Sequence, residues 1–254
     1  MFTYAVKVDI GVSAKNNDDR VLIGKELVVE GEISGSCCKS YISSAVFDGV
    51  GGMAMGYKAA ETAAEYLKIL DKESISAFDI MKCIEEANIK IRTMQTVKNI
   101  PKGMRTTIAV FYADEKHMII YNAGDSRVYR FRYRFFTQLS KEHSLVQQMI
   151  DAGQITIEEA KKHSKRNIIT KCLGETEIVA PYVIDMGDDF VKEDIIMICS
   201  DGISDNLYDT EIKKILLNGM DKSLLELCRK ICCKAIDNGS QDNLSIILIR
   251  KEEN

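Results

Sequence analysis

Four acidic motifs, each beside a short apolar run, are the part of this sequence best suited to chemistry. They are Asn17-Asp18-Asp19, Asp48-Gly49, Asp201-Gly202 and Asp242-Asn243. The neighbouring runs at 21–23, 45–47, 195–199 and 244–249 have the length and apolar character of buried strands. Each carboxylate is therefore expected at the end of a strand, where partial removal from water makes an unpaired charge costly.

A divalent metal ion is the simplest common partner for these carboxylates. Arg20 is the only Lys or Arg between any motif and its strand, so the sequence offers little positive charge of its own. Carboxylate ligands without His or Cys favour Mg²⁺ or Mn²⁺ over zinc. The alternative is four ordinary turns, because Asp-Gly is a common turn-forming pair.

The glycines that follow Asp48 favour the metal-site interpretation. The segment 46–52, VFDGVGG, contains more glycine than a strand requires, and it leads directly into a predicted helix. Glycine allows a backbone carbonyl to approach a ligand closely. The joint pattern of the motifs, rather than any one of them, indicates a site.

Composition indicates one globular enzyme domain spanning 1–254. The 254 residues are 46% hydrophobic and 28% charged, values typical of a folded domain with a large core. A net charge of −4 and the lack of a long basic run argue against a nucleic-acid partner. No segment approaches the roughly 20 apolar residues of a membrane span, and no signal-peptide pattern is present. The eight cysteines lack CxxC spacing, so reduced thiols and a cytoplasmic location are expected.

Strands and helices are predicted in blocks, which favours an α+β layered fold. Strands are expected near 3–10, 20–30, 40–47, 106–113, 117–122, 127–132, 135–139, 180–185, 194–199 and 244–250. Helices are expected near 53–70, 76–97, 209–217 and 222–237. The buried face of the second helix is predicted to carry Phe78, Met81, Ile84, Ala87 and Ile91.

Two further segments carry charge. The stretch 143–177 is polar and is predicted to be helical, and a capping-box pattern predicts that a helix begins at Thr156. The arginines of 127–134 alternate with apolar residues, which predicts a hairpin with one solvated face.

Seven ordered motifs resemble the metal-dependent protein phosphatase family (PPM) of the protein phosphatase 2C type. They are NNDD at 16–19, FDGVGGMAMG at 47–56, GMRTT at 103–107, NAGDSRVYR at 122–130, LSKEHSLV at 139–146, CSDGISD at 199–205 and QDNLSIILI at 241–249. The resemblance covers about 9–250. Val50 stands where animal and plant members usually have His, so the bacterial-type serine/threonine phosphatases are the closer branch. The resemblance implies a four-layer α-β-β-α sandwich of two antiparallel sheets flanked by paired helices.

The resemblance also implies a Mg/Mn-dependent enzyme that hydrolyses phosphoserine and phosphothreonine through a metal-activated water. It gives Asp48 the role of bridging two ions. It assigns the carbonyl of Gly49 and, through water, Asp18 to one ion; the family usually has Glu at the position of Asp18. Asp201 and Asp242 are assigned to the other ion.

The remaining expected roles concern water and phosphate. Asp19 would hold metal-bound water, and Asp125 resembles a ligand of a third, weaker ion, with a plain hairpin turn as the alternative. Ala14 stands where the family has a phosphate-binding Arg. Lys15 is the predicted catalytic substitute, and Arg20 is the other candidate.

The resemblance implies phosphorylated protein substrates and a cognate Ser/Thr kinase as partners. Segment 143–177 occupies the position of the family's flap, a mobile segment whose Lys161, Lys162, Lys165 and Arg166 are predicted to affect selectivity among protein substrates. His143 is expected to be structural. Two alternatives remain: a low-activity phosphoprotein-binding regulatory module, and a metal-dependent phosphoesterase acting on a small-molecule phosphate.

Overall fold

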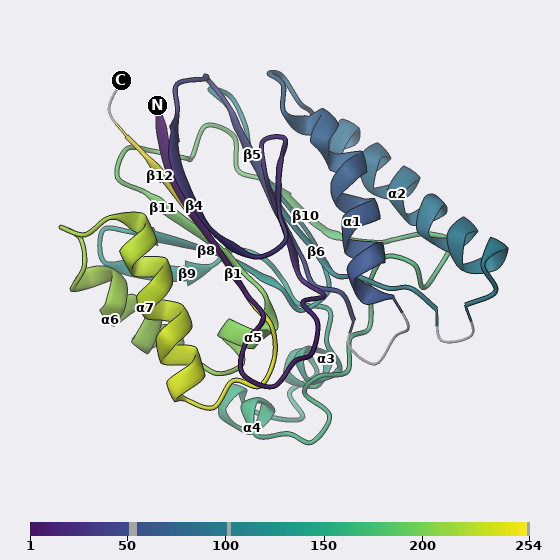
Figure 1. The fold of residues 1–254 in the computed structure, drawn as a ribbon. Helices are drawn as coiled ribbons and strands as arrows, with labels where there is room; N and C mark the ends of the chain where they lie inside the picture. Colours follow the sequence, from purple (N-terminus) through teal and green to yellow (C-terminus); the bar gives the residue numbers. More distant parts are fainter. Residues whose placement is uncertain (51–54, 101–102, 253–254) are drawn as a thin grey trace.

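Residues 1–50, 55–100 and 103–252 are described by a computed structural model. In these residues two six-stranded antiparallel sheets lie face to face, and helices cover both outer faces (Figure 1). The first sheet has the order β4-β1-β12-β11-β8-β9, and the second has the order β10-β7-β6-β5-β2-β3. The predicted α-β-β-α sandwich is confirmed.

Every strand pairs antiparallel with its neighbours within the described residues. The strands are β1 (Phe2–Asp9), β2 (Arg20–Ile23), β3 (Glu26–Val28), β4 (Gly31–Cys37), β5 (Ile42–Phe47), β6 (Ile108–Ala113), β7 (Met118–Ala123), β8 (Arg127–Arg132), β9 (Phe135–Gln138), β10 (Tyr182–Asp185), β11 (Ile195–Cys199) and β12 (Leu244–Lys251).

The helices form two pairs on the outer faces and a group of short helices at one end of the sandwich (Figure 1). They are α1 (Gly56–Leu67) with the 3₁₀ turn η1 (Lys68–Leu70), α2 (Ala77–Val97), α3 (Leu145–Asp151), α4 (Ile157–Lys161), α5 (Asp201–Ser204), α6 (Asp209–Leu217) and α7 (Leu224–Asp237). The first residues of the helix predicted over 53–70 lie outside the described residues.

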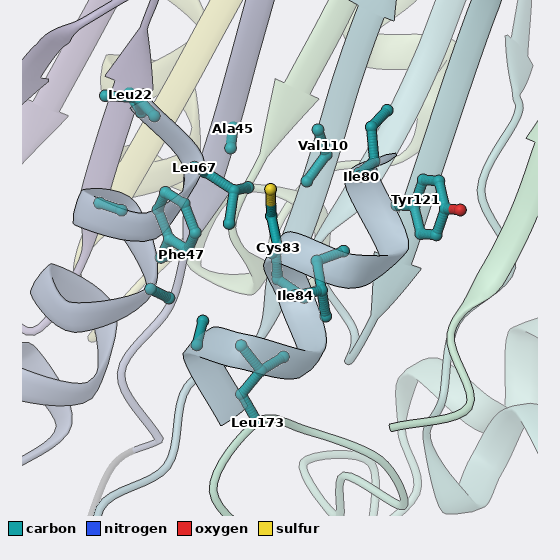
Figure 2. Close-up of a cluster of buried hydrophobic side chains, with 14 of the residues drawn as sticks. Leu22, Ala45, Phe47, Leu67, Ile80, Cys83, Ile84, Val110, Tyr121 and Leu173 are labelled. Carbon is teal, nitrogen blue, oxygen red and sulfur yellow. The ribbon is translucent and has the colours of Figure 1, made fainter. Parts of the chain in front are cut away.

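Three apolar clusters hold the four layers together. One fills the space between the sheets and includes Val6, Val46 and Ile247. A second joins α1 and α2 to the second sheet (Figure 2), and a third joins α6 and α7 to the first sheet. Because strands such as β5 are buried along their whole length, both sheets are rigid supports for the loops at their ends.

Two predictions from periodicity are wrong in detail. The single strand expected over 20–30 is a hairpin, because Gly24 turns the chain at a φ of +57° and β2 pairs back with β3. Strand β4 was missed, since its sequence is polar and it lies at the edge of its sheet.

The predicted face of α2 is also wrong at one end. The buried residues include Ile80, Ile84, Ala87 and Ile91, which follow helical spacing, whereas 66% of Phe78 is exposed. The helix begins with the capping box of Ser76, and α4 begins with the capping box predicted at Thr156. Segment 143–177 is only partly helical, since α3 and α4 are short.

The arginine hairpin is not solvated as predicted. Strands β8 and β9 form the hairpin, but Arg130 and Arg132 are ion-paired with Asp189, and Arg132 also pairs with Asp194. All eight cysteines are free thiols. None of the helices in the described part of the chain is long and apolar enough to cross a membrane.

Candidate active site

The acidic motifs lie at the same end of the two sheets. Asp19 precedes β2 and Asp48 follows β5, and these two strands pair in the second sheet. Asp201 follows β11 and Asp242 precedes β12, which pair in the first sheet. Antiparallel pairing places the end of one strand beside the start of the next, so each pair of motifs is brought together. Asp125 lies between β7 and β8, where the chain crosses from one sheet to the other.

Two glycines allow the motif backbones to touch. A Cβ atom on Gly202 would lie 2.0 Å from the carbonyl oxygen of Asn243. A Cβ atom on Gly49 would lie 2.8 Å from the carbonyl oxygen of Asp18. No side chain fits at either distance, so only glycine permits this approach. In each sheet, the motif after one strand therefore packs directly against the motif before the neighbouring strand. Gly49 packs against Asp18 in this way, and Gly202 packs against Asn243.

Residues without a predicted role fix these loops in place. The side chain of Asn243 accepts a hydrogen bond from the backbone N–H of Asp18 at 2.8 Å. The carbonyl of Asp48 accepts from the backbone N–H of Thr107 at 2.7 Å and from the hydroxyl of Thr106 at 3.0 Å. Asn243 belongs to the motif QDN, and Thr106 and Thr107 belong to the motif RTT. Their role as loop supports was not predicted, because it depends on contacts between segments that are distant in sequence.

The carboxylates of Asp48 and Asp201, both on half-buried residues, have strongly raised pKa values. Burial raises the pKa of Asp48 well above its ordinary value, and the neighbouring carboxylates of Asp201 and Asp19 raise it further. Burial also raises the pKa of Asp201, and Asp125 and Asp205 add to that effect. Within the described residues neither Asp48 nor Asp201 has an ion-pair partner. Their charges are therefore uncompensated by the protein.

Asp19 and Asp125 share this environment. Burial raises the pKa of Asp19 to about 7, although the hydroxyls of Ser245 and Ser200 act in the opposite direction. Burial, followed by the charge of Asp205, raises the pKa of Asp125 to about 7. Oδ2 of Asp19 and Oδ1 of Asp125 are buried without a hydrogen-bond partner in the described part of the chain. Such oxygens need a partner from outside the described chain, such as a water molecule or a metal ion.

Asp18 and Asp242 lie nearer to solvent. Asp18 is half-buried and accepts a hydrogen bond from the backbone N–H of Tyr57 at 3.1 Å, at the start of α1. Burial raises the pKa of Asp18, and the charge of Asp242 adds to the shift. Asp242 is exposed, and its carboxylate accepts from the next backbone N–H at 2.8 Å. These two carboxylates border the buried ones on the solvent side.

The donor set fits a hard divalent cation, although the side chains do not yet form a coordination shell. Among the described residues, no group of three or more His, Cys, Asp or Glu side chains is arranged so that it could hold a metal ion. The converging donors are nevertheless carboxylates, and two of them carry buried oxygens without partners. Mg²⁺ and Mn²⁺ prefer such ligands. Side-chain rotation would be needed to close the shell.

The loop before Asp18 lacks the family's phosphate-binding Arg, and it offers one cation, Lys15, that has no ion-pair partner in the described part of the chain. Arg20 is 6% exposed, pairs with Glu61 at 2.9 Å and donates to the carbonyl of Asn17 at 2.8 Å. The suggestion that Arg20 reaches the phosphate is therefore wrong, because its guanidinium is already bound. Lys15 lies exposed in the same loop, beside the half-buried Ala14. It stays the candidate for contact with phosphate.

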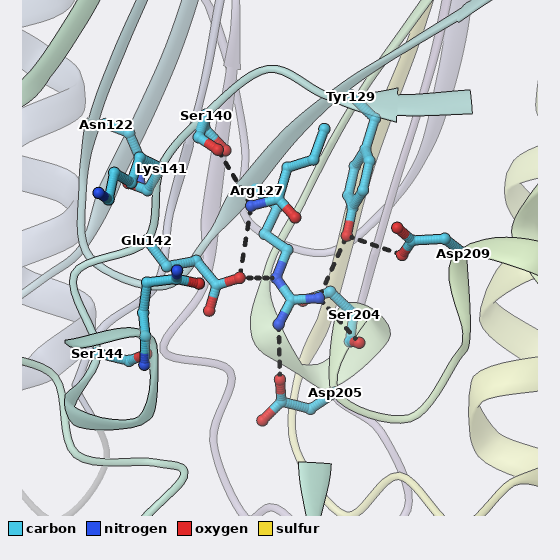
Figure 3. Close-up of polar contacts among 12 residues, drawn as sticks. Asn122, Arg127, Tyr129, Ser140, Lys141, Glu142, Ser144, Ser204, Asp205 and Asp209 are labelled. Carbon is cyan, nitrogen blue, oxygen red and sulfur yellow. Dashed lines mark hydrogen bonds and ion pairs between the residues drawn. The ribbon is translucent and has the colours of Figure 1, made fainter. Parts of the chain in front are cut away.

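A buried arginine beside the carboxylates was not predicted. The side chain of Arg127 is 12% exposed and pairs with Glu142 at 2.7 Å and with Asp205 at 3.4 Å (Figure 3). It also donates to the hydroxyl of Tyr129 at 3.2 Å and to the carbonyl of Ser204 at 3.3 Å. Arg127 thus joins the segment before α3 to the end of α5, which carries Asp201.

The helical spacing of Asp201 and Asp205 is the one sequence signal that could have pointed to this arrangement. The backbone N–H of Asp205 donates to the carbonyl of Asp201 at 2.9 Å, which is one turn of helix. Any contact that holds Asp205 therefore holds the backbone of Asp201 as well.

Segment 143–177 is fastened beside the site at both of its ends. At its start the backbone N–H of His143 donates to the carbonyl of Gly124 at 2.8 Å, and near its end a β-bridge joins Leu173 to Thr106, which contacts Asp48. A second bridge, between Ser144 and Ile169, closes the segment on itself. Burial, with help from Lys171 and Lys141, lowers the pKa of His143 to about 4. The neutral ring is positioned to accept from the backbone N–H of a neighbouring turn, at 3.5 Å, which agrees with a structural role.

Comparison with known proteins identifies the family. The chain is 30% identical over 217 residues to the serine/threonine phosphatase stp of Listeria monocytogenes, which covers 82% of this chain and 83% of that protein. It is 31% identical over 260 residues to a protein of Streptococcus pyogenes described as protein phosphatase 2C-type. This match covers 98% of this chain and 97% of that protein. The chain belongs to the protein phosphatase 2C-type (PPM) family. The family and the enzyme class expected from the motifs are confirmed.

Solved structures agree with this assignment. The structure of the serine/threonine phosphatase Stp1 from Staphylococcus aureus matches with a TM-score of 0.86 at 28% identity, covering 100% of this chain and 96% of that one. The catalytic domain of the phosphatase PstP, solved with two manganese ions, matches with a TM-score of 0.80 at 23% identity and shows that the two share a fold. A scan against models of protein families gives no match.

Proposed function

We propose that this PPM-family chain is a Mg²⁺- or Mn²⁺-dependent protein phosphatase acting on phosphoserine and phosphothreonine, with 1–254 as a single catalytic domain. One observation carries the proposal: buried and half-buried carboxylates from motifs far apart in sequence meet at the ends of both sheets, and no cation of the described residues pairs with Asp48 or Asp201. Relatives named as serine/threonine phosphatases supply the substrate class.

The proposed ligands follow from the position of each group. Asp48 lies between the motifs of the two sheets and would bridge two ions. The carbonyl of Gly49 and the carboxylate of Asp18 would serve the first ion, and Asp201 and Asp242 the second. The buried oxygens without partners support Asp19 as a residue that holds water near the ions, and Asp125 as a ligand of a third. PstP, which shares the fold, binds two manganese ions.

The chemistry divides between the ions and the chain. Bound Mg²⁺ or Mn²⁺ lowers the pKa of a water molecule and offsets the charge of the phosphoryl group. The chain holds Asp48 and Asp201 on rigid strand ends, so little reorganisation is required when substrate binds. The oxygen of Asp19 would orient the attacking water by accepting its hydrogen bond. Lys15 would contact the phosphate as a point charge, without the bidentate grip of an Arg.

The substrate would be a phosphorylated protein of the cytoplasm, and a Ser/Thr kinase would be its natural opponent. Segment 143–177 lies beside the site, and its Lys162, Lys165 and Arg166 are proposed to select among protein substrates. A regulatory module with little turnover is the second candidate, because Ala14 replaces the expected Arg and Asp18 replaces the usual Glu.

A manganese titration of two substrates tests the proposal. The protein, freed of metal by chelation, is assayed on a phosphothreonine peptide and on para-nitrophenyl phosphate as manganese is added. Hydrolysis of both substrates that requires manganese is expected. Peptide binding without turnover of either substrate would favour the regulatory module. Turnover restricted to small phosphate esters would favour a small-molecule phosphoesterase.

A further inference from the structure

A cavity of about 320 Å³ lies between the short helices α3 and α4, the start of α6 and the hairpin of β8 and β9. Its apolar wall is formed by Val146 and Ile150 of α3 and by Ile157 and Ala160 of α4. The volume is at the lower end of the range for small-molecule sites, roughly 300–1,000 Å³. It is large enough to admit one large apolar side chain.

The apolar faces of α3 and α4 pack against each other and line the cavity, rather than joining the main core. Val146 and Ile150 are one helical turn apart, and so are Ile157 and Ala160, so each helix presents a small apolar face. None of these four residues belongs to the three core clusters of the described chain. Ile157 is 63% exposed at the rim, and Tyr208 of the opposite wall is 51% exposed. Apolar surface around a cavity, left out of the core, is characteristic of a binding site.

Most charged side chains in the wall of the cavity already have partners within the protein. Arg127 is bound to Glu142 and Asp205, as Figure 3 shows. Lys161 donates to the carbonyl of Leu207 at 3.0 Å and lies 4.1 Å from the ring centre of Tyr208. These two cations are therefore engaged, and Arg166, the third cation of the lining, interacts electrostatically with Asp205. The lining also carries the carboxylates of Asp125, Glu142, Asp205 and Asp209, so the cavity is poorly suited to a second phosphate or another anion. An apolar group gains most from entering it.

The cavity is continuous with the carboxylate site. Asp125 and Asp205 line it, and Asp205 is hydrogen-bonded to the backbone of Asp201. A peptide whose phosphorylated residue reaches Asp48 and Asp201 could therefore place a nearby side chain between α3 and α4. This continuity favours a segment of the substrate over an unrelated small molecule.

We propose that the cavity between α3, α4 and the start of α6 binds an apolar side chain of the phosphoprotein substrate, close in sequence to the phosphorylated residue. This inference rests on the proposed phosphatase function. It makes the cavity a specificity site, at which leucine or phenylalanine is preferred to alanine or a charged residue.

A leucine scan of a phosphopeptide tests the preference. A polar phosphothreonine peptide is prepared with leucine at each flanking position in turn, and kcat/KM is measured with manganese. We expect leucine to raise kcat/KM about tenfold at one or two positions, the lower end of the discrimination available to an apolar pocket. No such position should respond to aspartate.

Two variants assign the preference to the cavity. Ala160→Phe should fill it, and Ile157→Ser should remove part of its apolar wall. Each should lower the ratio of kcat/KM for the best leucine peptide to that for its alanine counterpart at least fivefold. Ile168→Ser is the matched control, since Ile168 is 45% exposed on the same segment but does not line the cavity. Because Ile157 is mostly exposed, its replacement tests the site even if Ala160→Phe fails to fold.

The outcomes separate this inference from the proposed function. If para-nitrophenyl phosphate and every peptide resist hydrolysis with manganese, the proposed function fails. If the ester is hydrolysed but the leucine scan is flat, the inference is wrong and the phosphatase assignment stands. A leucine preference that survives both cavity variants would place the specificity site elsewhere and also overturn the inference.

Discussion

Two groups of carboxylates in this molecule, each with buried members, are treated in opposite ways. Asp194 behind the β8–β9 hairpin has a side chain only 1% exposed, and Arg132 pairs with it at 2.5 Å. Burial acts to raise the pKa of the neighbouring Asp189, but hydrogen bonds from Arg132 and Arg130 lower it below its ordinary value. At the strand ends, Asp48 is left without any such cation and its pKa is raised.

The difference indicates what each group is for. Where a carboxylate is structural, the fold supplies an arginine at hydrogen-bond distance. A cluster that has no paired cation among the described residues is unstable when fully ionised, so its charge must be offset either by protonation or by an ion from solution. Arg127 lies between the two cases, because it compensates Glu142 and Asp205 but leaves Asp201 uncompensated.

Removing the central carboxylate should produce the largest effect on activity. Asp48→Asn is expected to lower kcat on the order of 10³-fold, because a lost metal contact costs several kcal/mol of transition-state stabilisation. The metal-free variant should unfold at the same temperature as the parent or higher, since one repelling charge is gone. Calorimetry and a manganese-dependent assay measure the two effects.

Asp221→Asn is the control for that experiment, since its carboxylate is 75% exposed and far from the cluster in sequence. It should change neither activity nor unfolding temperature. Normal turnover by Asp48→Asn at saturating manganese would rule out a bridging role.

Removing the positive charge of Arg127 should affect folding more than catalysis. Arg127→Met leaves Glu142 and Asp205 buried without their partner, and loss of one member of a buried ion pair costs about 3–5 kcal/mol. The free energy of unfolding in urea measures this cost. In a double-mutant cycle with Glu142→Gln, the second change should then be much less destabilising than it is alone. Strictly additive costs would mean that the two side chains do not interact in solution.

The two groups should also respond to pH with opposite signs. The pKa values of Asp19 and Asp125 are raised from 3.8 to about 7, so their contribution to stability is present below about pH 4 and is lost as the pH rises through 7. Metal-free protein should therefore become less stable from pH 5 to pH 8. Asp189 has a lowered pKa, so its contribution is lost only when the pH falls below its ordinary range.

Manganese should remove the loss of stability at high pH. An ion present at 100 times its Kd stabilises the folded state by about 2.7 kcal/mol. Thermal unfolding with chelator and with manganese, measured across this pH range, should show a metal effect that grows with pH. A metal effect that shrinks as the pH rises would contradict an assembly of carboxylates that must lose protons to bind the ion.

The acidic residues were predictable because each lies next to its strand in the sequence. Asp48 and Asp201 directly follow apolar runs, and those runs form the centres of the two sheets. Arg127 and its partners were not predictable in this way. The partner Asp205 is 78 residues away, and only the pairing of β8 with β11 in the first sheet, which sets Cys199 opposite Arg127, brings it within reach.

Errors in the fold have a similar cause. Strand β4 is polar because it lies at an exposed edge, so it lacks the apolar pattern that reveals a buried strand. Phe78 is apolar but exposed, and periodicity alone assigned it to the core. Local pattern identifies what is buried on a regular face, whereas edges and tertiary ion pairs depend on the neighbours.

The smallest expected effect concerns the loop before Asp18, where Lys15 supplies a positive charge but cannot make the bidentate contact of an Arg. Ala14→Arg should supply a bidentate contact to phosphate and tighten substrate binding by about 1.5 kcal/mol, the lower end for hydrogen bonds to charged groups. KM should then fall about tenfold. If Lys15 already contacts the phosphate, Lys15→Ala in the parent should raise KM, and the gain from Ala14→Arg should be smaller. Manganese affinity should not change in either variant, because neither side chain is a carboxylate of the cluster. A shift in manganese affinity would mean that this loop contacts the ions rather than the phosphate.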